Sequence, residues 1–270
     1  MNIPYAEVIG DPISHSKSPM IHKFWLTKLG IEGDYRATQV APHDLEKFVE
    51  SRKSDKHWRG CNVTIPHKIA VMDFVADPGA VRDSIGAMNT IARDRDGAVM
   101  GTNTDAAGFY APISDMKLDG AQVAVIGSGG AARAVLFALS RCNVGGVTLL
   151  ARNPLKGAGL LARFGLKGSV QKLDTSLPPV TLLVNATSLG MTGQPPLTID
   201  LSPLPRDAVV YDLVYAPLQT PLLAAAESRD LVTVDGLEML VGQAAFAFEL
   251  FFGAPPPREC DEELRSLLIA

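Results

Sequence analysis

The sequence predicts an α/β protein with two α/β domains that flank a cleft, the second of them built on a doubly wound parallel sheet. Strand-like and helix-like stretches alternate along the 270 residues, a pattern typical of parallel sheets with helical crossovers. A glycine-rich turn at 127–132 follows an apolar strand and precedes a helix, and the polar stretch 117–121 separates two alternating series. The two series together predict two domains.

The first hundred residues predict five strands with helices between them. The strands are expected at 7–9, 35–40, 61–65, 89–93 and 98–102, with a turn at 94–97 joining the last two. Ser18 and Pro19 are typical of an N-cap followed by proline at the first helical position, and Gly30 ends this helix. A second helix is expected around residues 45–49.

The second series begins after a helix that runs from 104–105 to about 115. Its strands are expected at 123–126, 147–150, 181–184, 209–213 and 232–234. A helix at 134–139 follows the glycine-rich turn, and a long apolar helix at 237–252 ends before the prolines at 255–257.

Composition and charge argue against several classes of function. A net charge of −4 is unlike a nucleic-acid binder, which usually carries a basic face. No apolar run approaches the roughly 20 residues of a membrane span, and residues 1–5 do not resemble the start of a signal peptide. Cys61, Cys142 and Cys260 show neither zinc-ligand spacing nor a disulfide framework, which predicts reduced thiols in a cytoplasmic protein.

The glycine-rich turn predicts a dinucleotide site on a Rossmann-type domain. Residues 127–132 (GSGGAA) fit the pattern G-x-G-x-x-A between a strand and a helix. The first glycine permits the tight turn, the second lets the backbone approach a pyrophosphate, and the helix N-terminus offers free N–H groups to the phosphates. The alternative is a plain strand-to-helix turn.

The end of the next strand favours NADP over NAD. An NAD site usually places Asp or Glu about 20 residues past the glycines to hold the ribose 2′-hydroxyl, and residues 150–156 (LARNPLK) contain no carboxylate. Arg152 and Lys156 supply two cations that suit a 2′-phosphate. The alternative is that both residues only solvate a loop.

Lys68 is the candidate for proton transfer, because no metal-ligand cluster is apparent in the sequence. Pro66 opens a helix directly after the strand at 61–65, which places Lys68 in the first helical turn. A cation there opposes the positive end of the helix dipole, and this favours the neutral amine that a general base needs. Taken alone, Lys68 fits an ordinary solvated lysine better.

Seven motifs, in order, resemble the shikimate dehydrogenase family. They are residues 14–19 (SHSKSP), 61–68 (CNVTIPHK), 86–90 (GAMNT), 101–105 (GTNTD), 185–191 (NATSLGM), 211–215 (YDLVY) with Thr220 and Pro221, and 236–243 (GLEMLVGQ). The set covers nearly the whole chain, and an ordered set of this size is specific to the family.

The resemblance implies reversible NADP-linked reduction of 3-dehydroshikimate to shikimate, a step of aromatic amino-acid biosynthesis. It implies that Lys68 and Asp105 form the catalytic pair, with coupled titration. From the residues alone, Asp105 is also readily explained as the N-cap of its helix.

The resemblance also implies the substrate contacts. The substrate carboxylate would be bound by hydroxyl groups, those of Ser16, Ser18, Thr64 and Tyr215. The ring hydroxyls would be bound by Asn62, Asn89, Asp105 and Gln243, since amides both donate and accept hydrogen bonds. The local alternative makes the serines helix caps and the asparagines turn formers.

For the cofactor, the resemblance assigns the pyrophosphate to Gly127, Ser128, Gly129, Gly130 and Ala131. It assigns the adenosine phosphate to Arg152, Asn153 and Lys156, and it places Leu213, Gly236 and Met239 beside the nicotinamide. Members that use NADP commonly have asparagine at the position of Ala151 and threonine at the position of Asn153. Because this chain differs at both positions, the expected preference for NADP over NAD is smaller.

The family architecture implies a substrate-binding catalytic domain at 1–104, completed by 237–270, and an NADP-binding domain at 105–236. Two alternatives remain: a quinate/shikimate dehydrogenase paralogue that uses NAD or NADP, and a non-catalytic NADP-binding sensor. The sensor would lack the pair formed by Lys68 and Asp105. The expected partners are small molecules, with neither nucleic acid nor membrane, and the sequence leaves monomer and homodimer open.

Overall fold

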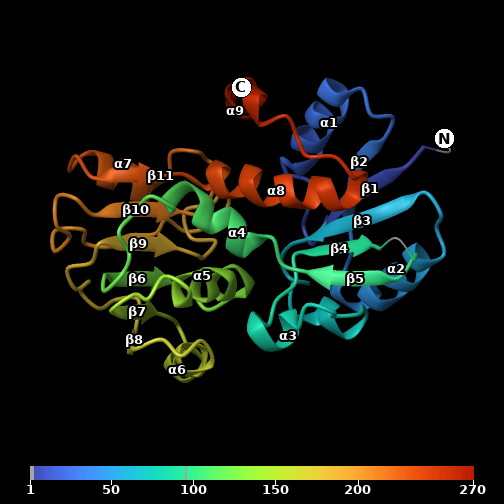
Figure 1. Ribbon diagram of the computed structural model, residues 1–270. Helices are drawn as coiled ribbons and strands as arrows, with labels where there is room; N and C mark the ends of the chain where they lie inside the picture. The colour runs from blue at the N-terminus through green and yellow to red at the C-terminus, as the bar shows by residue number, and fades with distance from the viewer. Residues whose placement is uncertain (1–2, 95) are drawn as a thin grey trace. The chain divides into compact units, whose positions relative to one another are not determined.

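A computed structural model describes residues 3–94 and 96–270. The chain divides into two compact units (Figure 1), one formed by the chain up to Thr104 with Val241–Ala270 and the other by Asp105–Leu240. The long helix α8 (Gly236–Phe252) begins in the second unit and ends in the first. The α/β fold class predicted from the sequence is confirmed in both units.

The first unit contains a mixed five-stranded sheet. Its strand order is β2 (Asp34–Gln39), β1 (Tyr5–Gly10), β3 (Trp58–Val63), β4 (Thr90–Arg93) and β5 (Val99–Thr102). The first three strands are parallel, whereas β4 and β5 are antiparallel to their neighbours. The predicted turn between β4 and β5 is present, with the Gly97 amide donating to the Asp94 carbonyl at 3.1 Å; Arg95 lies outside the described residues.

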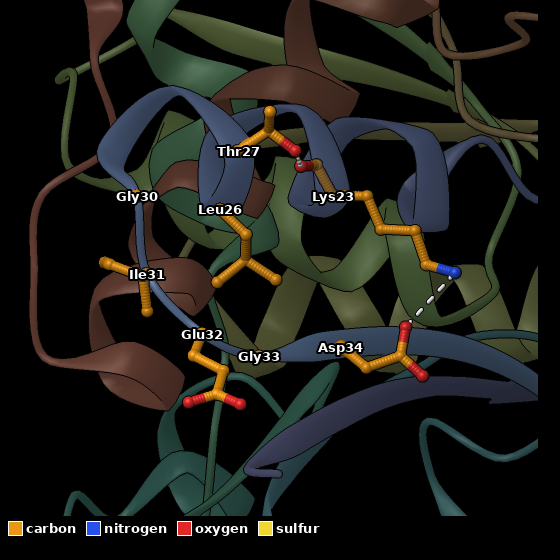
Figure 2. A pocket seen from close by; sticks show the side chains of 8 residues that line it. All are labelled: Lys23, Leu26, Thr27, Gly30, Ile31, Glu32, Gly33 and Asp34. Carbon is orange, nitrogen blue, oxygen red and sulfur yellow. Dashed lines mark hydrogen bonds and ion pairs between the residues drawn. The ribbon is translucent and has the colours of Figure 1, made fainter. Parts of the chain in front are cut away.

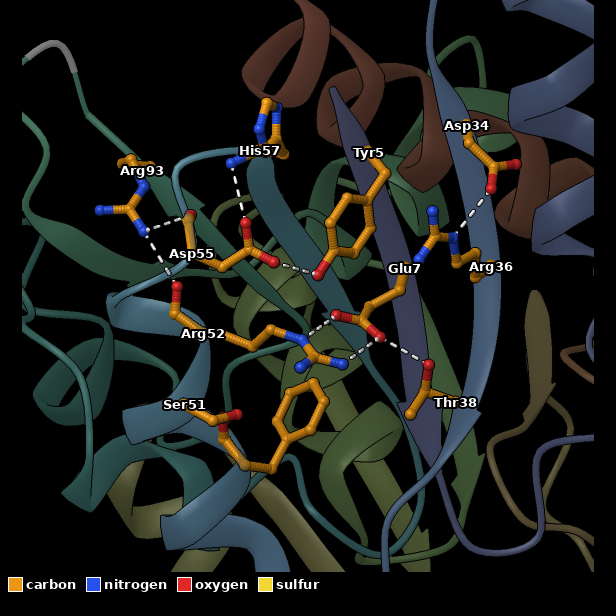
Figure 3. Close-up of polar contacts among 11 residues, drawn as sticks. Tyr5, Glu7, Asp34, Arg36, Thr38, Ser51, Arg52, Asp55, His57 and Arg93 are labelled. Carbon is orange, nitrogen blue, oxygen red and sulfur yellow. Dashed lines mark hydrogen bonds and ion pairs between the residues drawn. The ribbon is translucent and has the colours of Figure 1, made fainter. Parts of the chain in front are cut away.

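Successive side chains of β1 point to opposite faces of the sheet. Ala6 and Val8 pack with Phe251 of α8 on one face of the sheet, where α1 (Ser18–Leu29) also lies (Figure 1). Glu7, between them, bonds to Arg52 of α2 (Leu45–Lys53) on the opposite face (Figure 3). The sheet is therefore covered on both faces.

Helix α1 begins one residue away from its predicted cap. Lys17, not Ser18, occupies the N-cap position, no side chain caps the helix, and Ser18 is its first helical residue. The predicted stop is confirmed, because Gly30 has a left-handed backbone with φ of 62° and its amide bonds to the carbonyls of the last turn.

The prediction of a helix that begins at Pro66 is wrong. Residues 65–69 form turns, and only a short 3₁₀ helix, η2 (Ala70–Asp73), follows. The Lys68 carbonyl accepts from the Met88 amide at 2.7 Å, a long-range bond that takes the place of a helical i to i+4 bond. The helix-dipole argument for a neutral amine therefore does not apply to Lys68.

An aromatic cluster surrounds a buried histidine between the sheet and its helices. His22 of α1 stacks on Tyr35 of β2 at 3.9 Å between ring centroids, with an interplanar angle of 4°. Trp25, Phe248 and Phe251 surround the same ring. Both His22 ring nitrogens are buried, and neither has a hydrogen-bond partner among residues 3–94 and 96–270. Burial lowers the pKa of His22 to about 3.

This histidine makes stability depend on pH in a defined direction. Below its ordinary pKa the unfolded chain binds a proton that the folded protein excludes, so acid favours unfolding. Between about pH 7 and about pH 5, the wild-type protein should lose about 2 kcal/mol more unfolding free energy than His22→Phe. Urea unfolding at both pH values measures this difference, and equal losses would contradict it.

The second unit contains a fully parallel six-stranded sheet. Its strand order is β11 (Val232–Val234), β10 (Val209–Asp212), β9 (Leu182–Asn185), β6 (Gln122–Ile126), β7 (Gly146–Leu150) and β8 (Gly168–Gln171). The order reverses between β6 and β9. In doubly wound sheets, ligands bind beyond the carboxyl ends of the strands at such a switch point.

Helices cover both faces of this sheet, as predicted. Val123 and Val125 face α5 (Gly130–Ser140) and α6 (Pro154–Arg163). Ala124 and Ile126 face the side of α7 (Pro221–Glu227). The predicted strands at 147–150, 181–184, 209–213 and 232–234 are confirmed within one residue, whereas α6, α7 and β8 were not predicted.

The remaining elements are short. They are α3 (Val81–Ser84), α4 (Asp105–Tyr110), α9 (Asp261–Ile269), η1 (Pro42–Asp44), η3 (Ala111–Ile113) and η4 (Arg258–Cys260). Among the described residues, no helix combines the length and apolar character that crossing a bilayer requires.

Candidate active site

Three of the predicted substrate-binding amides form one buried cluster in the first unit. Asn62, Asn89 and Gln243 are 5%, 2% and 7% exposed, and they come from β3, the segment before β4, and α8. The Asn89 side-chain amide donates to the Gln243 carbonyl oxygen at 3.3 Å. Asn62 Nδ2 lies 3.5 Å from the Asn89 backbone carbonyl. The fold therefore brings together amides that are up to 181 positions apart in the sequence.

Two threonines complete this cluster, and the sequence did not single them out. Thr90 Oγ1 accepts from Asn62 Nδ2 at 3.1 Å, and Thr104 Oγ1 accepts from Asn89 Nδ2 at 2.8 Å. The Thr104 amide donates to Asn89 Oδ1 at 2.7 Å. Both threonines lie inside the predicted motifs at 86–90 and 101–105, which was the available signal.

The cluster also holds the residue that precedes Asp105. Thr104 is fixed by two hydrogen bonds to the Asn89 side chain, and Asp105 follows it as the first residue of α4. Asp105 is 4% exposed. A carboxylate so deeply buried is unlike a solvated surface group, and burial of this kind is typical of a functional or paired acid.

The loop that carries Lys68 is tied to the sheet at both ends. The Thr64 amide donates to the Ile9 carbonyl at 2.9 Å, and His67 Nε2 lies 2.7 Å from the Val40 carbonyl. Together with the bond from Met88 to the Lys68 carbonyl, these contacts hold the backbone on either side of the lysine. The Lys68 and Thr64 side chains are both half-buried.

The two predicted serines lie at the start of α1. Ser16 is half-buried and Ser18 is buried. Ser16 Oγ accepts from the Ser18 amide at 3.3 Å, a long bond between two residues on either side of the N-cap residue Lys17. Tyr215, the fourth predicted carboxylate ligand, belongs to the second unit, and burial raises its pKa, so its phenol keeps its proton as a donor.

In the second unit, the glycine-rich turn has the backbone that a pyrophosphate requires. Gly127 has φ of +115°, and a Cβ there would lie 2.8 Å from the Ala186 carbonyl oxygen, at the end of the neighbouring strand β9. Helix α5 begins at Gly130 with Gly129 as N-cap and no side-chain cap. Its first N–H groups are therefore not used by a capping side chain. Ser128 and Ala131 are half-buried beside them.

The predicted phosphate-binding cations lie where α6 begins. Arg152 and Lys156 are exposed. Asn153, predicted to bind the adenosine phosphate, is the N-cap of α6, and its side-chain oxygen accepts from the Lys156 amide at 3.1 Å. The cap orients the first turn of α6 and leaves the Asn153 Nδ2 group outside this bond.

A buried polar network holds the loops predicted to flank the nicotinamide. Asp212, at the end of β10, accepts from Asn185 Nδ2 at 2.8 Å, from the Val214 amide at 3.0 Å and from Thr220 Oγ1 at 2.7 Å. Burial raises the pKa of Asp212. These bonds join the predicted motifs at 185–191 and 211–215 and Thr220 to one another.

The last two predicted nicotinamide residues lie at the start of α8. A Cβ on Gly236 would lie 2.5 Å from the Leu213 carbonyl oxygen, so only glycine permits this approach of two backbones. The Leu213 amide in turn bonds to the Asn185 carbonyl at 3.0 Å. Met239, by contrast, is 7% exposed and packs in the apolar core of the second unit.

A surface hollow elsewhere contains none of the predicted site residues. It lies between the end of α1 and β2 (Figure 2) and is lined by Lys23, Leu26, Thr27, Gly30, Ile31, Glu32, Gly33 and Asp34. Lys23 and Asp34 form an ion pair at 3.1 Å. Within the described ranges, no group of three or more His, Cys, Asp and Glu residues has a metal-binding arrangement.

Comparison with known proteins places both units beside one family. Residues 8–91 match the shikimate dehydrogenase substrate binding domain, and residues 236–264 match the shikimate 5′-dehydrogenase C-terminal domain. The chain is 67% identical over 267 residues to a protein of Sphingopyxis alaskensis named shikimate dehydrogenase (NADP(+)), covering 99% of this chain and 97% of that protein.

Solved structures of shikimate and quinate dehydrogenases are similar to this chain over nearly its whole length. The shikimate 5-dehydrogenase of Thermus thermophilus, in complex with NADP(H) and shikimate, has a TM-score of 0.87 at 33% identity, covering 98% of this chain and 100% of that chain. A quinate dehydrogenase of Corynebacterium glutamicum, in complex with NAD, has a TM-score of 0.86 at 27% identity, covering 98% and 99% of the two chains.

Proposed function

The chain belongs to the shikimate dehydrogenase family, and from this membership we propose that it catalyses the reversible NADPH-dependent reduction of 3-dehydroshikimate to shikimate. The observation that carries the proposal is the buried cluster of Asn62, Asn89 and Gln243. Amide groups that are shielded from bulk water and fixed by hydrogen bonds are suited to a substrate with several ring hydroxyls.

Most of the proposed substrate ligands lie in the first unit, whereas Asp105 and Tyr215 lie in the second. We propose that Asn62, Asn89, Asp105 and Gln243 bind ring hydroxyls, and that Ser16, Ser18, Thr64 and Tyr215 bind the carboxylate through their hydroxyl groups. The half-buried positions of Ser16 and Thr64 support this role, because each hydroxyl keeps some access to a ligand.

The second unit has the features that NADP requires. The Gly127 backbone and the N-terminus of α5 would hold the pyrophosphate, with Ser128, Gly129, Gly130 and Ala131 in the same turn. Arg152 and Lys156, both exposed, with Asn153 beside them, would bind the 2′-phosphate. Leu213 and Gly236 would lie beside the nicotinamide, with Met239 supporting them from the core.

We propose that Lys68 and Asp105 handle the proton at the substrate oxygen. When bound, NADP accepts or donates a hydride at its nicotinamide ring. Lys68, as the neutral amine, takes the proton of the shikimate hydroxyl, and as the ammonium returns it to the ketone oxygen of 3-dehydroshikimate. Asp105 orients the lysine and binds a substrate hydroxyl.

The experiment that tests this function compares four substrate pairs. Steady-state rates are measured with shikimate and with quinate, each with NADP and with NAD. The highest kcat/KM is expected for shikimate with NADP. A preference for quinate with NAD would favour the alternative of a quinate dehydrogenase, and no turnover with any pair would favour a non-catalytic NADP-binding protein.

Arg152→Ala should weaken NADP far more than NAD. A charge-assisted hydrogen bond from Arg152 to the 2′-phosphate exists only with NADP, and its loss should raise the KM for NADP by about tenfold or more. Arg141→Ala is the matched control, because Arg141 is the C-cap of α5, at the end of that helix opposite the glycine turn. An equal rise in KM for both cofactors would contradict the contact.

We also propose a cytoplasmic enzyme whose partners are small molecules, monomeric or homodimeric. The three cysteines are free thiols, as expected in a reducing compartment. The net charge of −4 supports small-molecule ligands over nucleic acid.

A further inference from the structure

The hydrogen bonds of the amide cluster run in one direction, and a backbone N–H group, that of Thr104, fixes this direction. The Thr104 amide is an N–H and can only donate, so the atom it contacts in Asn89 is the carbonyl oxygen Oδ1. Asn89 Nδ2 then donates to Thr104 Oγ1 and Gln243 Oε1. The orientation of the Asn89 amide is therefore fixed.

The orientation of Asn62 follows from that of Asn89. The Thr90 hydroxyl lies 3.2 Å from Asn89 Oδ1 and donates to it, which leaves Thr90 Oγ1 as the acceptor for Asn62 Nδ2 at 3.1 Å. Asn62 Oδ1 must then point the other way, and there it accepts from the Tyr35 hydroxyl at 2.6 Å. Tyr35 therefore supplies the O–H group at the head of the chain.

Tyr35 is built to keep this role. It is fully buried in β2, its ring is stacked on His22, and burial raises its pKa well above the usual value. The phenol therefore stays protonated as a donor, and the stacked ring limits the movement of its hydroxyl. If the Asn62 amide flipped, the buried Tyr35 O–H group would lose its acceptor, and an unsatisfied buried donor is unfavourable in free energy. The hydrogen bond from Tyr35 therefore opposes a flip of the Asn62 amide.

We propose that Tyr35 is a positioning residue, which locks the Asn62 side-chain amide so that its nitrogen presents an N–H donor to a ring hydroxyl of the substrate. Asn62 Nδ2 carries two hydrogens, and the bond to Thr90 uses one. The contact to the Asn89 carbonyl, at 3.5 Å, is at the limit for a hydrogen bond, so the second hydrogen can be given to a ligand. The inference rests on the proposed function.

The test is a double-mutant cycle of Tyr35→Phe and Asn62→Ala, with shikimate and NADP. Tyr35→Phe keeps the ring and its stack on His22 but removes the hydroxyl. The KM for shikimate should rise roughly tenfold in Tyr35→Phe, with kcat and the KM for NADP little changed. In the Asn62→Ala background the same change should have no further effect on KM.

Tyr5→Phe is the matched control, since it removes a hydroxyl from the neighbouring strand. Tyr5 is also buried, and its hydroxyl bonds to Asp55 at 2.8 Å, away from the amide cluster. Its loss should leave the KM for shikimate unchanged. An unchanged KM in Tyr35→Phe, or the same rise with and without Asn62, would overturn the proposal.

A second measurement needs no turnover. The Asn62 side-chain NH₂ resonances, assigned by their absence in Asn62→Ala, should shift in Tyr35→Phe and stay in place in Tyr5→Phe. Unchanged resonances in Tyr35→Phe would overturn the proposal that Tyr35 orients the Asn62 amide. If the wild-type protein does not oxidise shikimate, the proposed function fails, and these resonances still decide whether Tyr35 holds Asn62.

Discussion

Replacing Lys68 with alanine is expected to lower kcat for shikimate oxidation by at least ~10²-fold, or about 2.7 kcal/mol at the transition state, with little change in KM. The bond that ties the Lys68 loop to Met88 uses the Lys68 backbone carbonyl, which alanine retains. The variant therefore removes the amine and keeps the loop, so a lower kcat reports on proton transfer.

Two further variants complete this measurement. Lys47→Ala removes an exposed lysine of α2 and should leave kcat unchanged. If Lys68 and Asp105 act as a pair, Asp105→Asn should add less to Lys68→Ala than it costs in the wild-type protein. Turnover near the wild-type rate in Lys68→Ala would exclude its catalytic role, and fully multiplicative losses would exclude the pairing with Asp105.

Local patterns predicted the elements that bury apolar side chains. The strands β6, β7, β9 and β10 consist largely of buried apolar residues, and a continuous apolar run is typical of a parallel sheet covered on both faces. The strand β8 (Gly168–Gln171) was missed because it is polar and partly exposed at the edge of the sheet. Periodicity carries no signal for such a strand.

Contacts between distant segments set the limit of prediction in the candidate site. The helix predicted at Pro66 fails because the Lys68 carbonyl bonds to the Met88 amide, and no local rule reveals a bond across 20 positions. Tyr35 was assigned only to a strand, since its function in the amide cluster depends on Asn62, 27 positions away. The motifs identified Asn62, Asn89 and Gln243, but only the fold shows which groups orient them.

Replacing Arg52 with leucine should cost about 3–5 kcal/mol of unfolding free energy, because it leaves a buried carboxylate without its partner. Glu7 is fully buried in β1. Arg52 Nε and Nη2 donate to its two oxygens at 2.7 and 3.3 Å, and Thr38 Oγ1 donates at 2.5 Å (Figure 3). The hydrogen bond to Glu7 also raises the pKa of Arg52, as expected of a tightly held pair.

A second arginine of the same unit provides the matched control. Arg36 of β2 bonds to Asp34 at 2.8 Å, but the Arg36 side chain is 46% exposed and that of Asp34 26%, against 25% for Arg52 and 1% for Glu7. Solvent screens the first pair, so Arg36→Leu should cost less than about 1 kcal/mol. Urea unfolding of both variants measures the contrast, and equal losses would contradict the effect of burial.

The double variant Glu7→Leu with Arg52→Leu separates a lost attraction from an unpaired charge. If the cost of Arg52→Leu comes from the buried carboxylate that it leaves behind, removing the carboxylate as well should restore much of the stability. If the attraction itself accounts for the cost, the double variant should be as unstable as the single one. Because β1 is bonded to both β2 and β3, we expect the single variant to unfold the first sheet at a lower urea concentration.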